Sequence, residues 1–118
     1  MKQEIEYDNK IKSLEWQFED YSFQLTNSVE QLFKIDDALQ ISVNRARIDL
    51  ILSKEIIPVY VKKSEAYKIL ILLKKADDGY LLDFCCENQK VIPSEEELEI
   101  IKNWCMNKQI ILSNGVRL

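Results

Sequence analysis

Three cysteines carry the most reactive side chains in this sequence, at Cys85, Cys86 and Cys105. Such a set suggests a soft-metal or redox site, but structural zinc takes four ligands, usually from Cys-x-x-Cys pairs. Cys86 falls on the inward face of an expected strand and Cys105 on the apolar stripe of an expected helix, as small buried hydrophobic residues do. No cationic residue beside Cys85 marks a reactive thiolate. We therefore predict reduced thiols, no metal site and no cofactor.

The sequence contains no histidine, which excludes Ser-His-Asp and Cys-His nucleophile pairs and the common histidine metal sites. Its two isolated glycines cannot form a phosphate-binding loop. Of two aspartate pairs, Asp77-Asp78 belongs to a turn signature and Asp36-Asp37 resembles helix-cap or surface charge. Glu95 to Glu97 is typical of the first turn of a helix, where the helix dipole favours carboxylates. We predict no catalytic residue and no enzyme activity.

Aromatic residues are concentrated between positions 16 and 23, where they alternate with acidic ones. They are Trp16, Phe18, Tyr21 and Phe23. All four could be core residues. The alternative is a protein-binding surface, in which aromatic anchors lie inside a charged rim and an acidic rim suits a basic partner. For that alternative, the predicted contact residues are Glu15, Trp16, Glu19 and Asp20.

The segment from Leu14 to Leu25 fits both a helix and a hairpin. Apolar residues recur at helical spacings, but a helix leaves Trp16 and Phe23 on the side opposite the apolar stripe. A turn at Glu19-Asp20 places the aromatic residues on one face. The cross-strand pairs would then be Phe18 with Tyr21, Trp16 with Phe23 and Leu14 with Leu25. We favour the hairpin.

A helix is predicted from Ser28 to Lys54, beginning at the N-cap residues Asn27 and Ser28. The stretch Leu39 to Leu50 leaves a hairpin open as an alternative, with a turn at Asn44-Arg45.

The second half predicts a three-stranded antiparallel meander. Its strands are Ile56 to Lys63, Tyr67 to Lys75 and Tyr80 to Glu87, with a hairpin turn at Asp77-Asp78-Gly79. The middle strand is apolar on both faces, so both sides of the sheet must be covered. In the third strand, Tyr80, Leu82, Phe84 and Cys86 are expected to share one face.

A capping box of Ser94 and Glu97 predicts a helix from Ser94 to Asn107, followed by a short strand at Ile110 to Leu112 and a turn at Asn114-Gly115. The fold class is therefore α+β: residues 1–118 form a single domain in which this helix and helical material from the first half pack an antiparallel meander. Either the first half or a second copy in a homodimer covers the other side of the sheet.

The chain is acidic, with 16 basic and 20 acidic side chains and a net charge of −4. Residues 1–57 hold 11 acidic and 7 basic residues, so the excess lies there. An acidic chain disfavours binding to nucleic acid or anionic membranes, which needs a basic face. The start has no signal-peptide pattern, and no apolar run approaches the roughly 20 residues of a membrane span. We expect a cytoplasmic location.

The leading functional hypothesis is a non-catalytic acidic protein-binding module that blocks a partner protein with a basic surface. Inhibitors, immunity proteins, antitoxin-like proteins and phage anti-defence factors act in this way, and the hypothesis rests on that analogy. The alternative is a regulatory nucleic-acid- or ligand-binding domain, with the lysine pairs Lys62-Lys63 and Lys74-Lys75 as contacts. A thiol-dependent enzyme comes third.

Overall fold

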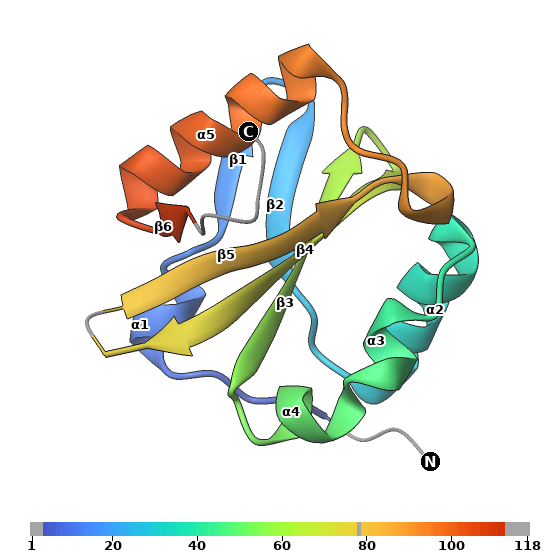
Figure 1. Ribbon diagram of the computed structural model, residues 1–118, viewed down its shortest axis with the longest axis vertical. Coiled ribbons are helices and arrows are strands. Elements are labelled where there is room, and N and C mark those ends of the chain that lie inside the picture. The colour runs from blue at the N-terminus through green and yellow to red at the C-terminus, as the bar shows by residue number, and fades with distance from the viewer. Residues whose placement is uncertain (1–3, 78, 113–118) are drawn as a thin grey trace.

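The centre of the molecule is a six-stranded sheet in which the strands follow one another in chain order (Figure 1). The structure, a computed structural model, describes residues 4–77 and 79–112. The strands are β1 (Trp16–Phe18), β2 (Tyr21–Leu25), β3 (Ile56–Lys63), β4 (Ala66–Ala76), β5 (Gly79–Cys86) and β6 (Ile111–Leu112). Neighbours are antiparallel except β5 and β6, which run parallel because a helical crossover joins them. The predicted meander is β3 to β5.

Helical segments precede, interrupt and follow the strands. They are α1 (Asn9–Lys12), α2 (Val29–Leu39), α3 (Val43–Ala46), α4 (Ile48–Leu52), the 3-10 turn η1 (Asn88–Lys90) and α5 (Glu95–Lys108). Among the described residues, none of these helices has the length and apolar character needed to cross a membrane.

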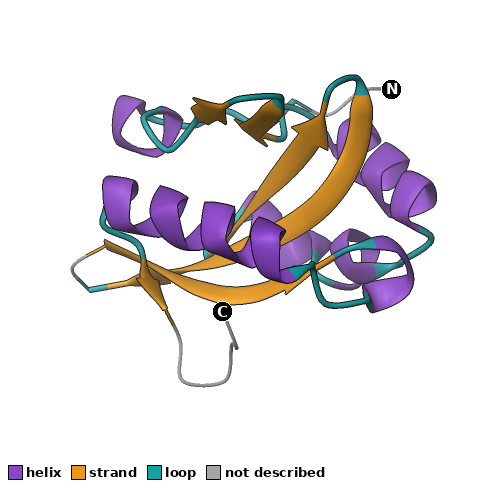
Figure 2. Ribbon diagram, turned by 90° about the horizontal axis from the view of Figure 1, so that it is seen from above, coloured by secondary structure: helices purple, strands orange, loops and turns teal. Residues whose placement is uncertain are grey.

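Helices lie on both sides of the curled sheet (Figure 2). A hydrophobic core lies on each face of the sheet. On one face, Ile101 and Trp104 of α5 pack against strands β2 to β5, and we call this the α5-side core. On the other face, Leu32 and Ile35 of α2 pack against β3 to β5, which we call the α2-side core. The α+β prediction is confirmed, and helices of the first half supply the second cover.

Strand β4 contributes to both cores, as its apolar sequence predicted. Ile69, Ile71 and Leu73 belong to the α5-side core, whereas Leu70 and Leu72 belong to the α2-side core. All five side chains are at least 99% buried. A strand buried on both faces has no solvent side, so β4 is the centre of the fold.

The expectation that alternate residues of β5 share one face is wrong. A bulge opposite Leu72–Leu73 leaves Asp83 as an extra residue in β5, because Leu72 pairs with Phe84 while Leu73 pairs with Leu82. Leu82 therefore lies in the α5-side core, and Phe84 packs against the α2-side core. An inserted residue reverses the alternation of all side chains beyond it.

The predicted hairpin at the N-terminal edge of the sheet is confirmed. Strands β1 and β2 pair Trp16 with Phe23 and Phe18 with Tyr21. The predicted pair of Leu14 with Leu25 is wrong, because β1 begins only at Trp16 and the Leu25 N–H donates to the Glu15 side chain instead. Glu19 and Asp20 form the turn, and β2 continues the sheet by pairing with β3.

Residues 28–54 are helical, but in three pieces and not in one helix. Ser28 caps α2, accepting a hydrogen bond from the Gln31 N–H at 3.1 Å. Helix α2 ends at Leu39, and the next residue, Gln40, has a φ of +55°. Leu39, Ile41 and Val43 are all buried in the α2-side core, and a continuous helix cannot place residues spaced by two on one side.

Helix α5 begins with the predicted capping box. Ser94 accepts from the Glu97 N–H at 3.2 Å, and Glu97 accepts from the Ser94 N–H at 3.1 Å. The helix ends at Lys108, and β6 is the predicted short strand. The predicted turn at Asn114-Gly115 lies outside the described residues.

Candidate functional site

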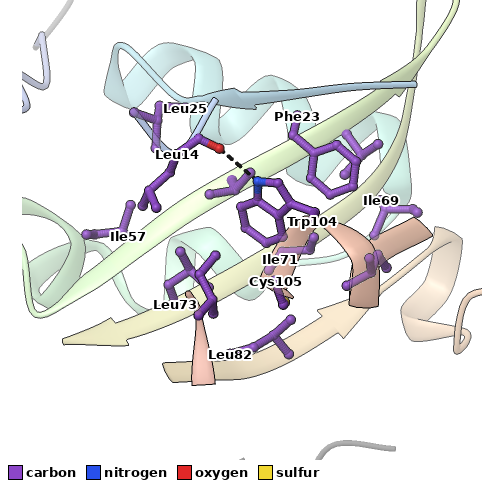
Figure 3. Close-up of a cluster of buried hydrophobic side chains, with 14 of the residues drawn as sticks. Leu14, Phe23, Leu25, Ile57, Ile69, Ile71, Leu73, Leu82, Trp104 and Cys105 are labelled. Atoms are coloured by element: carbon purple, nitrogen blue, oxygen red, sulfur yellow. Dashed lines mark hydrogen bonds between the residues drawn. The ribbon is translucent and has the colours of Figure 1, made fainter. Parts of the chain in front are cut away.

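The hairpin that carries the predicted contact residues is fixed to α5 by Trp104. The Trp104 indole N–H donates a 2.8 Å hydrogen bond to the carbonyl oxygen of Leu14, just before β1 (Figure 3). Its ring stacks on Phe23 of β2 with centroids 4.8 Å apart, and its side chain is fully buried. A buried hydrogen bond and a buried ring contact thus hold both strands of the hairpin against the helix.

Aromatic side chains lead from this anchor to the surface. Trp16 meets Phe23 edge-on at 5.5 Å between ring centroids and stacks on Phe18 at 5.7 Å. Phe23 is 1% exposed and Trp16 is half-buried, whereas Phe18 is 36% exposed. Trp16 is therefore partly a core residue, and Phe18 is the aromatic side chain that reaches solvent.

The predicted acidic residues Glu19 and Asp20 are exposed at the tip of the hairpin. Glu19 has φ of +53°, and its carbonyl accepts a hydrogen bond from the Gln17 side-chain amide at 2.9 Å. The Asp20 carbonyl accepts from the Ser64 N–H at 2.9 Å, which joins the tip to the turn between β3 and β4. We call Trp16, Phe18, Glu19 and Asp20 the hairpin surface.

A lysine from the neighbouring strand lies close to this acidic tip. The Lys63 ammonium is 5.4 Å from the centre of the Tyr21 ring. Tyr21, and less strongly the charges of Asp20 and Glu96, raise the pKa of Lys63. The acidity of the tip is thus partly compensated from within the chain.

Glu15 comes from the same hairpin but faces a different space. Its Oε2 accepts a 3.1 Å hydrogen bond from the Leu25 N–H, which holds the carboxylate against β2. It lines an open cleft of about 570 Å³ that is also lined by Tyr7, Gln24 and Tyr60. We call this the Glu15 cleft. The four predicted contact residues therefore belong to one hairpin but to two surfaces.

Sequence reasoning missed the participants from outside the hairpin. Tyr7 and Tyr60 reach the Glu15 cleft from a loop and from β3, and nothing in their local sequence indicates a shared cleft. Phe18 was one of the four aromatic residues noted, but its exposure depends on its place at the outer end of the stack.

The cysteines lie in surroundings that suppress thiol chemistry. Burial raises the pKa of Cys85 to about 11, and burial together with the nearby Cys85 raises the pKa of Cys105 to about 12. Cys86 is buried as well. Since the thiolate is the nucleophile and the metal ligand, thiols with such high pKa values react slowly at neutral pH.

The aspartates considered as candidate sites occupy structural positions where the structure describes them. Asp36 is fully buried and accepts hydrogen bonds from the N–H groups of Asn44 and Arg45, at 3.1 and 3.0 Å, at the start of α3. Asp37 forms a 2.8 Å ion pair with Arg45. Asp77 is an exposed turn residue, and Asp78 lies outside the described residues. Within residues 4–77 and 79–112, no three acidic or cysteine side chains gather as metal ligands would.

The two lysine pairs of the alternative hypothesis lie far apart. Lys63 pairs with Ala66 at one end of the β3–β4 ladder, and Lys74 pairs with Ile56 at the other. Seven residues of strand separate these ends, a span of about 23 Å. The register of the sheet therefore does not bring the two pairs into one basic patch.

Comparison of the chain with protein-family models, with curated proteins and with solved structures found no match.

Proposed function

We propose that this chain is a non-catalytic, cytoplasmic protein-binding module that blocks a partner protein through the hairpin surface. The observation that carries the proposal is the exposed Phe18, which caps a rigid aromatic stack beside the exposed carboxylates of Glu19 and Asp20. The blocking role is inferred by analogy with small acidic inhibitors and with immunity or antitoxin-like proteins, which act by covering a surface of their partner.

The rigidity of the hairpin favours tight binding. Trp104 fixes the hairpin to the core through Leu14 and Phe23, so little conformational entropy remains to be lost when a partner docks. A few anchor residues, often aromatic, supply most of the binding energy at a protein interface. Acidic residues at its rim accelerate the approach of a partner with a basic surface and make the approach sensitive to salt.

The environment of the thiols supports a role without catalysis. With pKa values of about 11 and 12, Cys85 and Cys105 are protonated at neutral pH and cannot serve as ready nucleophiles. The fully buried Asp36 is engaged in holding the start of α3.

The proposal is tested by capture of partners from a native extract at a series of salt concentrations. The test variant carries Glu19→Lys and Asp20→Lys. Both new side chains keep a Cβ, so the cost of the positive φ at Glu19 is unchanged. The matched control is Glu55→Lys with Asp77→Lys, which makes the same charge change at exposed positions beside the opposite end of the β3–β4 ladder.

We expect wild type and control to capture the same basic protein. The hairpin variant should capture less of it, and the loss should be largest at low salt. Phe18→Ala should weaken capture at every salt concentration, by about 2 kcal/mol if Phe18 is the anchor. Phe18 is a better test than Trp16 because the half-buried Trp16 also stabilises the hairpin. Equal capture by folded hairpin variants and wild type, or capture of nucleic acid alone, would refute the proposal.

A further inference from the structure

The Glu15 cleft holds a fixed set of hydrogen-bonding groups between two tyrosine side chains. The Tyr60 hydroxyl donates to Gln24 Oε1 at 2.7 Å and accepts from the Gln31 amide at 3.1 Å. The Tyr7 hydroxyl and the buried Thr26 hydroxyl are 3.3 Å apart. Together with the bond from Leu25 to Glu15, these contacts fix the lining before any ligand arrives.

The electrostatics of the cleft favour a cation. Burial is the main cause of the raised pKa of Tyr60, and the charge of Glu15 adds to it, so the carboxylate acts on this hydroxyl. The Tyr7 ring already attracts a cation, since the Lys54 ammonium lies 5.7 Å from its centre. A carboxylate beside an aromatic ring suits a guanidinium group, which can donate hydrogen bonds to the carboxylate while its plane stacks on the ring.

We propose that the Glu15 cleft binds an arginine side chain of the partner, with the Glu15 carboxylate pairing with the guanidinium beside the half-buried Tyr7. This inference rests on the proposed function, because it names the group that a basic partner would insert beside the hairpin surface. Lys12 lines the same cleft, and its positive charge opposes the binding of a cation there.

The test is an NMR titration of the whole protein with N-acetyl-arginine amide, and with N-acetyl-lysine amide for comparison. We expect saturable shifts at the amides of Glu15, Leu25 and Thr26, with the arginine probe bound more tightly. Glu15→Gln keeps an acceptor for the Leu25 N–H but removes the charge, so affinity should fall about tenfold. Lys12→Gln should raise affinity severalfold, and Glu99→Gln should leave it unchanged.

Absence of saturable shifts, or equal binding by Glu15→Gln and wild type, would overturn the cleft assignment. The titration needs no partner, so its failure is distinguishable from failure of the proposed function. If the cleft assignment fails while the charge-reversed hairpin still abolishes capture, the hairpin surface alone carries binding.

A second and independent feature is a pair of carboxylates where β5 leads toward α5. Glu87 Oε1 and Glu97 Oε2 are both buried, and neither accepts a hydrogen bond from the described groups. Each lies 3.9 Å from the Lys68 ammonium of β4, beyond hydrogen-bonding distance. The Glu97 side chain is only 6% exposed, and its other oxygen is occupied by Ser94.

We propose that Glu87 and Glu97 share one proton, which is released as the pH rises through the neutral range, and that this proton ties the segment after β5 to the first turn of α5. A proton between the two carboxyls satisfies both orphan oxygens and removes the repulsion of two buried charges.

The electrostatic surroundings agree with this assignment. Burial, followed by the neighbouring Glu97 carboxyl, which favours a proton on Glu87 both as a potential acceptor and as a like charge, raises the pKa of Glu87 to about 7, and Lys68 opposes the shift. Burial would raise the pKa of Glu97, but a protonated Glu87 as donor, the hydrogen bonds from Ser94 and the charge of Lys68 outweigh it and lower that pKa. Tyr21, Lys63 and Glu96 also interact electrostatically on this side, and Glu97 and Glu96 act on Tyr21.

Loss of the shared proton should loosen the segment from 87 to 94. The Glu87 N–H donates to the Val91 carbonyl at 2.6 Å, which closes the segment into a turn. The side chains of Val91 and Ile92 are 56% and 63% exposed, so little packing holds this segment in place. Because the folded pKa of Glu87 lies above its unfolded value, its contribution to stability is complete below about pH 4.5 and declines as the pH rises towards 7.

The test is carbon-13 NMR titration of the glutamate carboxyls, with amide exchange of residues 87–94 followed over the same range. We expect the Glu87 carboxyl to titrate near pH 7 in wild type. Its pKa should be lower in Glu97→Gln, which removes the neighbouring carboxylate, and higher in Lys68→Met, which removes the opposing charge. In wild type, amide exchange of residues 87–94, corrected for its intrinsic pH dependence, should accelerate above pH 7. In Glu87→Gln it should not accelerate, because the Gln amide can donate to Glu97 at every pH. The control Glu99→Gln should behave as wild type. Titration of every glutamate below pH 5.5 would overturn the proposal.

Discussion

Trp104 shows how a single residue can be assigned to the core from sequence while its structural role stays hidden. Its position on the apolar stripe of α5 predicts burial, and the side chain is fully buried. Its hydrogen bond to Leu14 joins residues 90 positions apart, and no local pattern encodes that contact. The same holds for Glu15, whose carboxylate binds the Leu25 N–H across the hairpin and faces tyrosines from two other segments.

The thiols of Cys85 and Cys105 should react slowly in the folded protein. Cys85 and Cys105 should react with iodoacetamide at pH 8 at least roughly a hundredfold more slowly in the native protein than in urea, because a pKa of about 11 leaves roughly one thiol in a thousand ionised. Mass spectrometry of peptides after timed quenching would identify the modified residue. Rapid stoichiometric labelling of Cys85 in the folded protein would show that its surroundings have been misread.

At the scale of elements, the sequence predicted best where pairing and capping are local. The hairpin follows from alternating aromatic residues about a two-residue turn, and α5 from its capping box. The breaks in residues 28–54 were missed because they depend on tertiary contacts. Asp36 of α2 holds the N–H groups of Asn44 and Arg45, and Ile41 and Val43 turn into the α2-side core.

Capping energetics provide a matched pair of variants. Ser94→Ala should destabilise the protein by about 1 kcal/mol, because the Ser94 hydroxyl accepts the Glu97 N–H at the start of α5. Ser42 holds the equivalent position before α3 but makes no capping hydrogen bond with its side chain, so Ser42→Ala should change stability by less than about 0.5 kcal/mol. Urea unfolding of both variants measures the difference, and equal effects would contradict the assignment of the caps.

For the whole molecule, the composition and the two-faced strand β4 predicted an α+β fold with cover on both sides of the sheet. The bulge at Asp83 was not predictable, because alternation in Tyr80–Cys86 continues unbroken in the sequence while the backbone inserts a residue. The division of the contact residues between two surfaces was also hidden, since it depends on which face of the hairpin meets α5.

The two cores should unfold as one cooperative unit because β4 belongs to both. Leu70→Ala in the α2-side core and Ile71→Ala in the α5-side core should each cost about 2–5 kcal/mol, with an unchanged dependence on denaturant concentration. Calorimetry and urea unfolding measure these effects. A cost below about 0.5 kcal/mol at either position would place that face of β4 outside the core.

The central claim is that the hairpin surface is the contact surface for a protein partner, and protection in the complex tests it most directly. Hydrogen–deuterium exchange of the chain, alone and bound to the captured partner, would map the contact. We predict protection concentrated in residues 15–24, with α2–α4 and the Lys74–Lys75 end of the sheet unchanged. Protection over α2–α4 or over those lysines, with the hairpin unaffected, would contradict the account.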